Sequence, residues 1–133
     1  MSKQIIPLPN TVASTSPNGN RTYVAGADIA EGQPLKFGDN ERTVVPTVEA
    51  TDIAIGIALD RAEKGEHIAV ALCGNFTGTV LLVATGAIAA GAQVNARGAT
   101  AAAGDIVIGR ALTPAATGEF VEITHQVAAT LTA

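Results

Sequence analysis

The sequence DIAIGIALDRAEKGEHIAV at residues 52–70 returns as DIVIGRALTPAATGEFVEI at residues 105–123. Aligned without a gap at a shift of 53, the two stretches are identical at nine of nineteen positions. Further pairs, such as Ile68 with Val121, exchange one branched aliphatic side chain for another. Internal similarity of this kind predicts that both stretches form the same strand–turn–strand unit.

A second, weaker match lies upstream of each stretch. ADIAEGQPL at residues 27–35 resembles GAIAAGAQV at residues 86–94, at a shift of 59. The two shifts differ by six, so the second copy has lost six residues between the matching parts. Two copies are too few for a solenoid. We therefore expect one domain over 21–133 with internal pseudo-twofold symmetry, built from units at about 26–72 and 85–125.

The secondary-structure pattern indicates an all-β fold. Short runs rich in branched aliphatic residues recur between glycine and proline clusters, which is typical of a small antiparallel barrel or sandwich. These runs are IAIGIAL (53–59), HIAVALC (67–73), TVLLVA (79–84), DIVIGRAL (105–112) and EFVEITH (119–125). The last run alternates, with Phe120, Glu122 and Thr124 predicted on one face and Val121, Ile123 and His125 on the other.

The repeated glycines fall into three pairs. Gly56 and Gly109 lie inside strand patterns, where glycine indicates a bulge or a close approach of two backbones. Gly65 and Gly118 precede the next strand and predict hairpin turns. Gly32 and Gly91 predict turns after a short strand that contains Ile29 or Ile88. We expect replacement of Gly56 or Gly109 by valine to lower the melting temperature more than replacement of Gly19.

Residues 1–20 differ from the rest of the chain. They contain Pro7, Pro9 and Pro17 among polar residues, which predicts an extended arm rather than a strand of the chain's own core. Ile5, Ile6, Pro7 and Leu8 are its apolar cluster. Such a segment cannot repay the entropy of ordering by itself. We therefore expect these four residues to bind a partner, either a neighbouring subunit or a larger particle.

Composition excludes several classes of function. The net charge is −4 and the chain has no basic run, which argues against a nucleic-acid footprint. No apolar run is long enough to span a membrane. The start, MSKQIIPLPNTV, has no secretory h-region, so we expect a protein made and kept in a cytoplasm. From His67 to Gly104 the one charged residue is Arg97; the exposed positions there should be threonine, alanine, glycine and asparagine.

The sequence predicts no catalytic, metal or cofactor site. His67, His125 and Cys73 lack partners at metal-ligand spacing, and the cysteine is expected to be a small core residue. The acid pairs Asp52/Asp105 and Glu66/Glu119 follow from the duplication and are interpreted as turn residues. Lys64 lies on a candidate hairpin, as the modified lysine of biotin and lipoyl carrier domains does, but its flanks differ.

The pattern of glycines and aliphatic residues resembles that of small capsid cement or decoration proteins of tailed phages. The resemblance implies a non-enzymatic β-rich subunit without a cofactor that binds the outside of an icosahedral shell and stabilises it. Its implied partners are the major capsid protein and further copies of itself, as a homodimer or homotrimer, on the virion after synthesis in the bacterial cytoplasm. The matching segments are ADIAEGQPLKF, EATDIAIGIAL, KGEHIAVALCG, GAIAAGAQV, AGDIVIGRAL and TGEFVEI.

Two other interpretations remain open at this stage. ADIAEGQPL also looks like the opening of β-clip domains that bind small ligands or assist assembly. A structural piece of a phage tail or baseplate would share the same composition.

Overall fold

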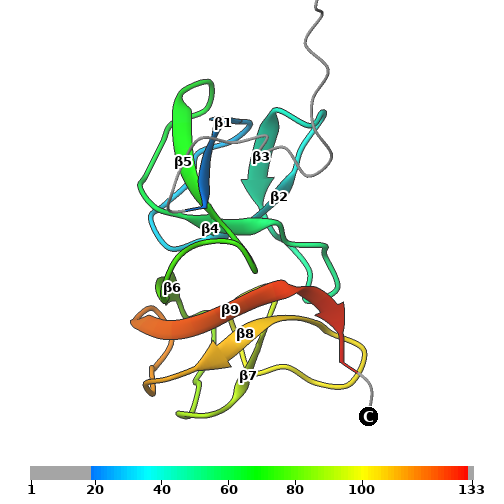
Figure 1. Ribbon diagram of the computed structural model, residues 1–133, viewed down its shortest axis with the longest axis vertical. Coiled ribbons are helices and arrows are strands. Elements are labelled where there is room, and N and C mark those ends of the chain that lie inside the picture. Colours follow the sequence, from blue (N-terminus) through cyan, green and yellow to red (C-terminus); the bar gives the residue numbers. More distant parts are fainter. Residues whose placement is uncertain (1–18, 132–133) are drawn as a thin grey trace, which may run out of the picture.

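The computed structural model describes residues 19–131, which are built of β-strands without a helix (Figure 1). None of its segments could therefore cross a membrane as a helix. The strands of the first half are β1 (Asn20–Ala25), β2 (Pro34–Phe37), β3 (Thr43–Pro46), β4 (Gly56–Ala58) and β5 (His67–Leu72). Those of the second half are β6 (Val80–Val83), β7 (Gln93–Asn95), β8 (Ile106–Ala111) and β9 (Phe120–Thr130). The predicted all-β class is confirmed.

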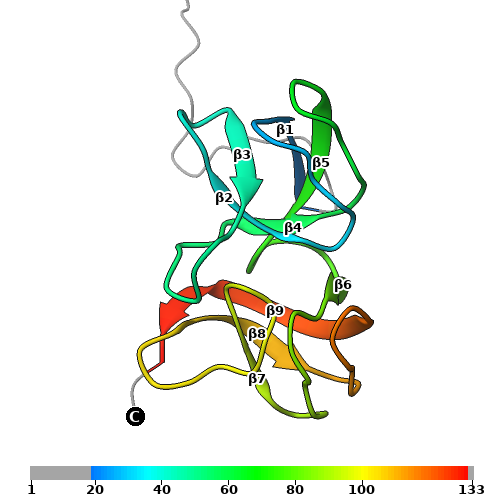
Figure 2. The same cartoon turned by 180° about the vertical axis from the view of Figure 1, so that it is seen from behind.

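The strands form two units that lie one above the other along the long axis of the molecule (Figures 1 and 2). The first unit, residues 20–72, is a closed barrel in the order β1-β3-β2-β4-β5. The second unit, residues 80–130, is a four-stranded sheet in the order β6-β9-β8-β7. The architecture is thus one barrel and one related sheet.

Strand pairing confirms the duplication residue by residue. In the first unit Gly56 faces Leu72 and Ile57 faces Ala71. In the second unit Gly109 faces His125 and Arg110 faces Thr124, each 53 positions further on. The weaker match holds equally well, because Leu35 faces Gly56 and Val94 faces Gly109. A shift of 59 before the deletion and 53 after it therefore relates the two units.

The repeat begins earlier than the sequence indicated. β1 pairs with β5 through Tyr23 and Ile68, and β6 pairs with β9 through Leu82 and Val121, which are the same positions of the two units. The strands expected just before Gly32 and Gly91 are single bridges instead. Ile29 bridges to Ala62 and Ile88 bridges to Ala115. Each pairing is too short to be a strand because the turn glycine follows three residues later.

The two units differ at β3, where the six residues are missing. In the first unit β3 pairs antiparallel with β2 and parallel with β1, which closes the barrel and departs from the purely antiparallel expectation. The second unit has a tight loop there, organised by the buried side chain of Asn95. Its Oδ1 accepts hydrogen bonds from the amides of Arg97 and Ala99, at 2.9 and 3.1 Å. Its Nδ2 donates to Asp105 at 3.0 Å.

The first unit supplies part of what the missing strand would have given to β6. In the first unit the amide of Val24 donates to the carbonyl of Arg42, next to β3, at 2.8 Å. The equivalent amide in β6, that of Val83, donates to the carbonyl of Gly32 in the first unit at 2.9 Å. A turn of one unit thus covers the edge of the other.

Two apolar clusters form the core. One fills the barrel and includes Leu35, Val44 and Val70, each with no exposed surface. The other lies in the second unit around Leu82 and Ile108, and it also takes in residues of β4, β5 and the chain that follows: Ile57, Ala71 and Cys73. Because this second cluster contains side chains from both units, burial of apolar surface holds the units together.

His125 contacts the backbone of the β5–β6 connection, which joins the two units. Its Nδ1 accepts a hydrogen bond from the amide of Gly74 at 2.8 Å, and its Nε2 lies 3.0 Å from the carbonyl of Gly78. This pair of contacts fits a neutral ring with its proton on Nε2. His125, which the sequence placed on the same strand face as Val121 and Ile123, therefore contacts the backbone of its own chain.

Candidate contact surfaces

The predicted partner-binding residues Ile5, Ile6, Pro7 and Leu8 lie outside the described residues. The described chain begins at Gly19, whose carbonyl accepts a hydrogen bond from the amide of Leu72 at 3.3 Å. The next residue, Asn20, already belongs to β1 and pairs with Ala71. The barrel therefore starts inside the segment that the sequence assigned to the arm.

The acid pairs stabilise turns, as the sequence indicated. One oxygen of Asp52 accepts hydrogen bonds from the amides of Val48 and Glu49, at 2.7 and 2.9 Å. Asp105 accepts one from the amide of Ala102, which is equivalent to Glu49. These backbone donors hold the pKa of both carboxyl groups below the ordinary value, with smaller contributions from Lys36 beside Asp52 and Asn95 beside Asp105.

The second acid pair does the same in the hairpins. Glu66 accepts a hydrogen bond from the amide of Glu63 at 2.7 Å, and Glu119 accepts one from the amide of Ala116 at 2.8 Å. The glycines before them, Gly65 and Gly118, have φ angles of 93° and 87°. The predicted hairpin turns are confirmed, because only glycine adopts this conformation without strain.

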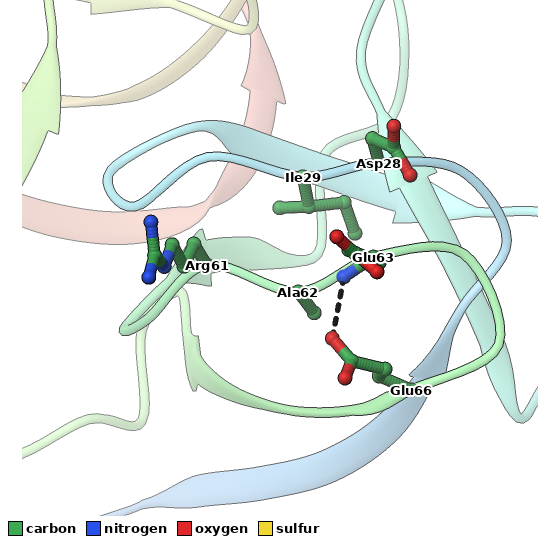
Figure 3. Close-up of a pocket in the computed structure, with 6 residues that line it drawn as sticks. All are labelled: Asp28, Ile29, Arg61, Ala62, Glu63 and Glu66. Carbon is green, nitrogen blue, oxygen red and sulfur yellow. Dashed lines mark hydrogen bonds between the residues drawn. The ribbon is translucent and has the colours of Figure 1, made fainter.

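An open hollow of about 490 Å³ lies beside the first of these hairpins (Figure 3). Its lining residues are Asp28, Ile29, Arg61, Ala62, Glu63 and Glu66. Two of its carboxylates already accept backbone hydrogen bonds, Glu66 from Glu63 and Asp28 from the amide of Lys64. Across residues 19–131, no group of three or more histidine, cysteine or acidic side chains is arranged to hold a metal ion.

The second unit does not preserve the charged lining of this hollow. Its positions equivalent to Asp28, Arg61 and Glu63 are Ala87, Pro114 and Ala116. Of the four charged lining residues only the turn acid is kept, as Glu119, while Ile88 and Ala115 match Ile29 and Ala62. The structure therefore offers a repeated turn here rather than a repeated binding site.

Cys73 is buried, and the loss of solvation raises the pKa of its thiol to about 12. The thiol is therefore protonated at neutral pH, which is unsuited to nucleophilic chemistry. The sequence correctly predicted a small core residue, since Cys73 belongs to the apolar cluster of the second unit.

An apolar groove between the two units is the feature that sequence reasoning missed. We call it the interunit groove, and it encloses about 390 Å³. Its residues come from β1, β2, the β3–β4 loop, β5, the β5–β6 connection and β9: Tyr23, Phe37, Ile53, Ala54, Ile55, Leu72, Cys73, Asn75, Val127 and Ala128. None of them is charged. No local pattern could have revealed it, because residues a hundred positions apart in the sequence line it together.

The residues from His67 to Gly104 present a surface that is poor in charge. As predicted, most exposed residues between His67 and Gly104 are threonine, alanine, glycine or asparagine. Leu81 is the large apolar exception, with 52% of its surface exposed. Arg97 is also exposed. A surface of this kind costs little to remove from water, which suits a contact with another protein.

Comparisons with known proteins agree on one kind of relative. The family model described as phage cement protein matches residues 14–125. A solved structure of the head fibre gp8.5 N base of bacteriophage phi29 has a TM-score of 0.63 and 17% identity. The match covers 82% of this chain and 94% of that one, and at this identity it shows the shared fold. No curated protein sequence matches the chain.

Proposed function

Because this chain belongs to the phage cement protein family, we propose that it is a decoration subunit, which binds the outer surface of a phage head and stabilises it. The family match over residues 14–125 is the observation that carries the proposal. It supports a structural role in the phage capsid, hence a protein associated with the virion. The proposal goes beyond the family match in two respects, namely that the chain binds the outer surface of the head and that this binding makes the head more stable.

The side chains and surfaces of the described residues support a function in binding another protein. The acid pairs are engaged in turns, and the thiol of Cys73 is held protonated by burial. The surfaces that remain available to a partner are the interunit groove and the charge-poor surface of residues 67–104. Both suit recognition of protein surfaces rather than of a small polar substrate.

The proposed partners are the major capsid protein and neighbouring copies of the chain. A shell presents the same site many times, so contacts that are weak individually hold a subunit strongly when several act together. The arm adds such a contact. In this proposal Ile5, Ile6, Pro7 and Leu8 bind a neighbouring subunit or the shell, and Pro7 and Pro9 reduce the entropy lost on binding by stiffening the segment.

Deletion of residues 1–12 tests this role of the arm. We expect the truncated chain to remain folded, because β1 begins at Asn20, and to bind undecorated capsids more weakly than the full chain. The measurement is co-sedimentation with capsids, together with circular dichroism of the free protein. A matched variant replaces Ile5, Ile6 and Leu8 with serine, and its control replaces Thr11, Ser14 and Thr15 with alanine.

Full binding by both the truncated chain and the triple serine variant would refute the role of the arm. Absence of capsid binding by the intact chain would refute decoration itself. A truncated chain that fails to fold would show that the arm belongs to the protein's own core, and the serine variant would then report on binding alone.

A further inference from the structure

We propose that the interunit groove of one copy receives residues 5–8 from the arm of a neighbouring copy, so that copies of the chain are joined by arm exchange. This inference rests on the proposed role of the arm and names its receptor. It concerns contacts between copies of this chain, whereas the contact with the shell is a separate matter.

The groove has the chemistry of a receptor for an apolar peptide. Phe37, Ile53 and Val127 border it and are 45%, 64% and 70% exposed, although they are large apolar side chains. Exposed apolar surface gathered in one hollow marks a binding site more often than scattered single residues do. Since no charged residue lines the groove, its occupant should be uncharged as well.

The arm supplies a segment that fits these demands. Ile5, Ile6 and Leu8 are apolar, and the one charged residue of the first eighteen is Lys3. Pro7 and Pro9 have no amide hydrogen. A segment with fewer backbone donors leaves fewer of them unpaired when it enters an apolar groove, which lowers the cost of burial.

The described chain begins at Gly19, beside the groove. Gly19 packs so closely on the backbone of Asn75, which lines the groove, that a side chain there would overlap it. The carbonyl of Gly19 also accepts a hydrogen bond from the amide of Leu72, a second groove residue. Eleven steps along the chain separate Leu8 from Gly19. At about 3.3–3.6 Å per residue they span at most about 36–40 Å.

This reach favours the groove of a neighbour over the chain's own groove. A domain of about 100 residues has a radius of gyration of about 13 Å, so its diameter of roughly 35 Å is close to the span of the extended arm. Pro7, Pro9 and Pro17 favour that extended form. Return to the chain's own groove, right beside Gly19, would instead require these residues to close into a tight loop.

Cysteine cross-linking between two kinds of chain tests the exchange, both in a Cys73→Ser background. One chain carries Leu8→Cys and the other, made longer by a tag, carries Val127→Cys. After mixing and mild oxidation, we expect a mixed disulfide between the two chains, identified by mass spectrometry of the linked peptides. The matched control carries Leu81→Cys in place of Val127→Cys, since Leu81 is also exposed but belongs to β6.

A second measurement avoids cysteine altogether. Val127→Asp should lower self-association of the full chain, followed by sedimentation velocity, at least tenfold, while Leu81→Asp should leave it unchanged. Val127 is exposed on β9, so the aspartate does not disturb the core.

Three results would overturn the inference. These are a Leu8–Val127 disulfide that forms only within one chain carrying both substitutions, cross-linking to Leu81→Cys as efficient as to Val127→Cys, and unaltered self-association of Val127→Asp. Capsid binding is measured separately. Chains that exchange arms but do not decorate heads would refute the proposed function and leave arm exchange standing.

Discussion

At the scale of single residues, Gly56 and Gly109 show why the repeat keeps glycine inside a strand. Neither has a positive φ angle. A side chain at Gly56 would overlap the carbonyl oxygen of Ala71, and one at Gly109 would overlap that of Thr124, the equivalent residue. The two positions therefore need glycine for space, as the sequence indicated, and Gly109 also adjoins a register shift between β8 and β9.

We expect Gly56→Ala and Gly109→Ala each to destabilise the fold by about 1–3 kcal/mol, because the paired strand must move to admit a methyl group. The measurement is the melting temperature, which should fall by several degrees for a chain of this size. Gly86→Ala is the matched control, since its added carbon would lie 3.5 Å from the Cβ of Ala99, an ordinary contact.

Gly19, which the sequence suggested as the reference position for these substitutions, is not a neutral control. Gly19 has a φ angle of 75°, and a side chain there would overlap the carbonyl oxygen of Asn75. Gly19 is thus as constrained as the strand glycines. A melting temperature of Gly86→Ala as low as that of Gly56→Ala would contradict the spatial explanation.

At the scale of elements, the duplicated motif predicted the pairs β4–β5 and β8–β9 because glycine and aliphatic spacing fixes local turns and faces. Val121 and Ile123 are buried while Phe120 and Thr124 are exposed, as the alternation indicated. β9 nevertheless continues to Thr130, five residues beyond the predicted run. The extension QVAAT carries no alternation, and its pairing with β8 comes from the tertiary structure.

β1, β2 and β3 were not predicted as strands because their pairing depends on partners distant in sequence. Val44 in β3 is buried, and β3 pairs with both β1 and β2. This short run therefore forms a strand only when the barrel closes. The sequence also did not predict that the second unit lacks a strand equivalent to β3. The sequence alignment of the two units revealed the deletion of six residues, but it did not reveal that the buried side chain of Asn95 organises a loop in place of the strand. The interunit groove was beyond prediction for the same reason, as it exists only once both units are in place.

At the scale of the whole molecule, charge is divided between the two units. Nine acidic and five basic residues lie between Arg21 and Glu66, whereas only five charged residues lie from Arg97 onward. Because the units are stacked along the long axis (Figure 2), one end of the molecule is acidic and the other is poor in charge. We expect the charge-poor end to face the capsid, where less desolvation opposes contact.

The duplication provides a matched pair of substitutions for this expectation. Leu81 in β6 and Thr22 in β1 are equivalent and both exposed, and each lies opposite an equivalent residue, Glu122 or Ala69. Leu81→Lys should weaken binding to undecorated capsids about tenfold, which corresponds to about 1.4 kcal/mol, while Thr22→Lys should have little effect. Titration of capsids with labelled protein measures both. A larger loss for Thr22→Lys would point to the opposite end.

The carbonyl of Gly32, which covers the edge of β6, also bears on how the chain is made. During synthesis the first unit leaves the ribosome before the second, and a closed barrel needs no later strand to complete its edges. β6, in contrast, finds the acceptor for Val83 only on a unit that has already formed. We therefore expect the first unit to act as a template on which the second folds. Pulsed hydrogen exchange during refolding should protect the amides of β4 and β5 before those of β6, and the reverse order would exclude such a sequence of events.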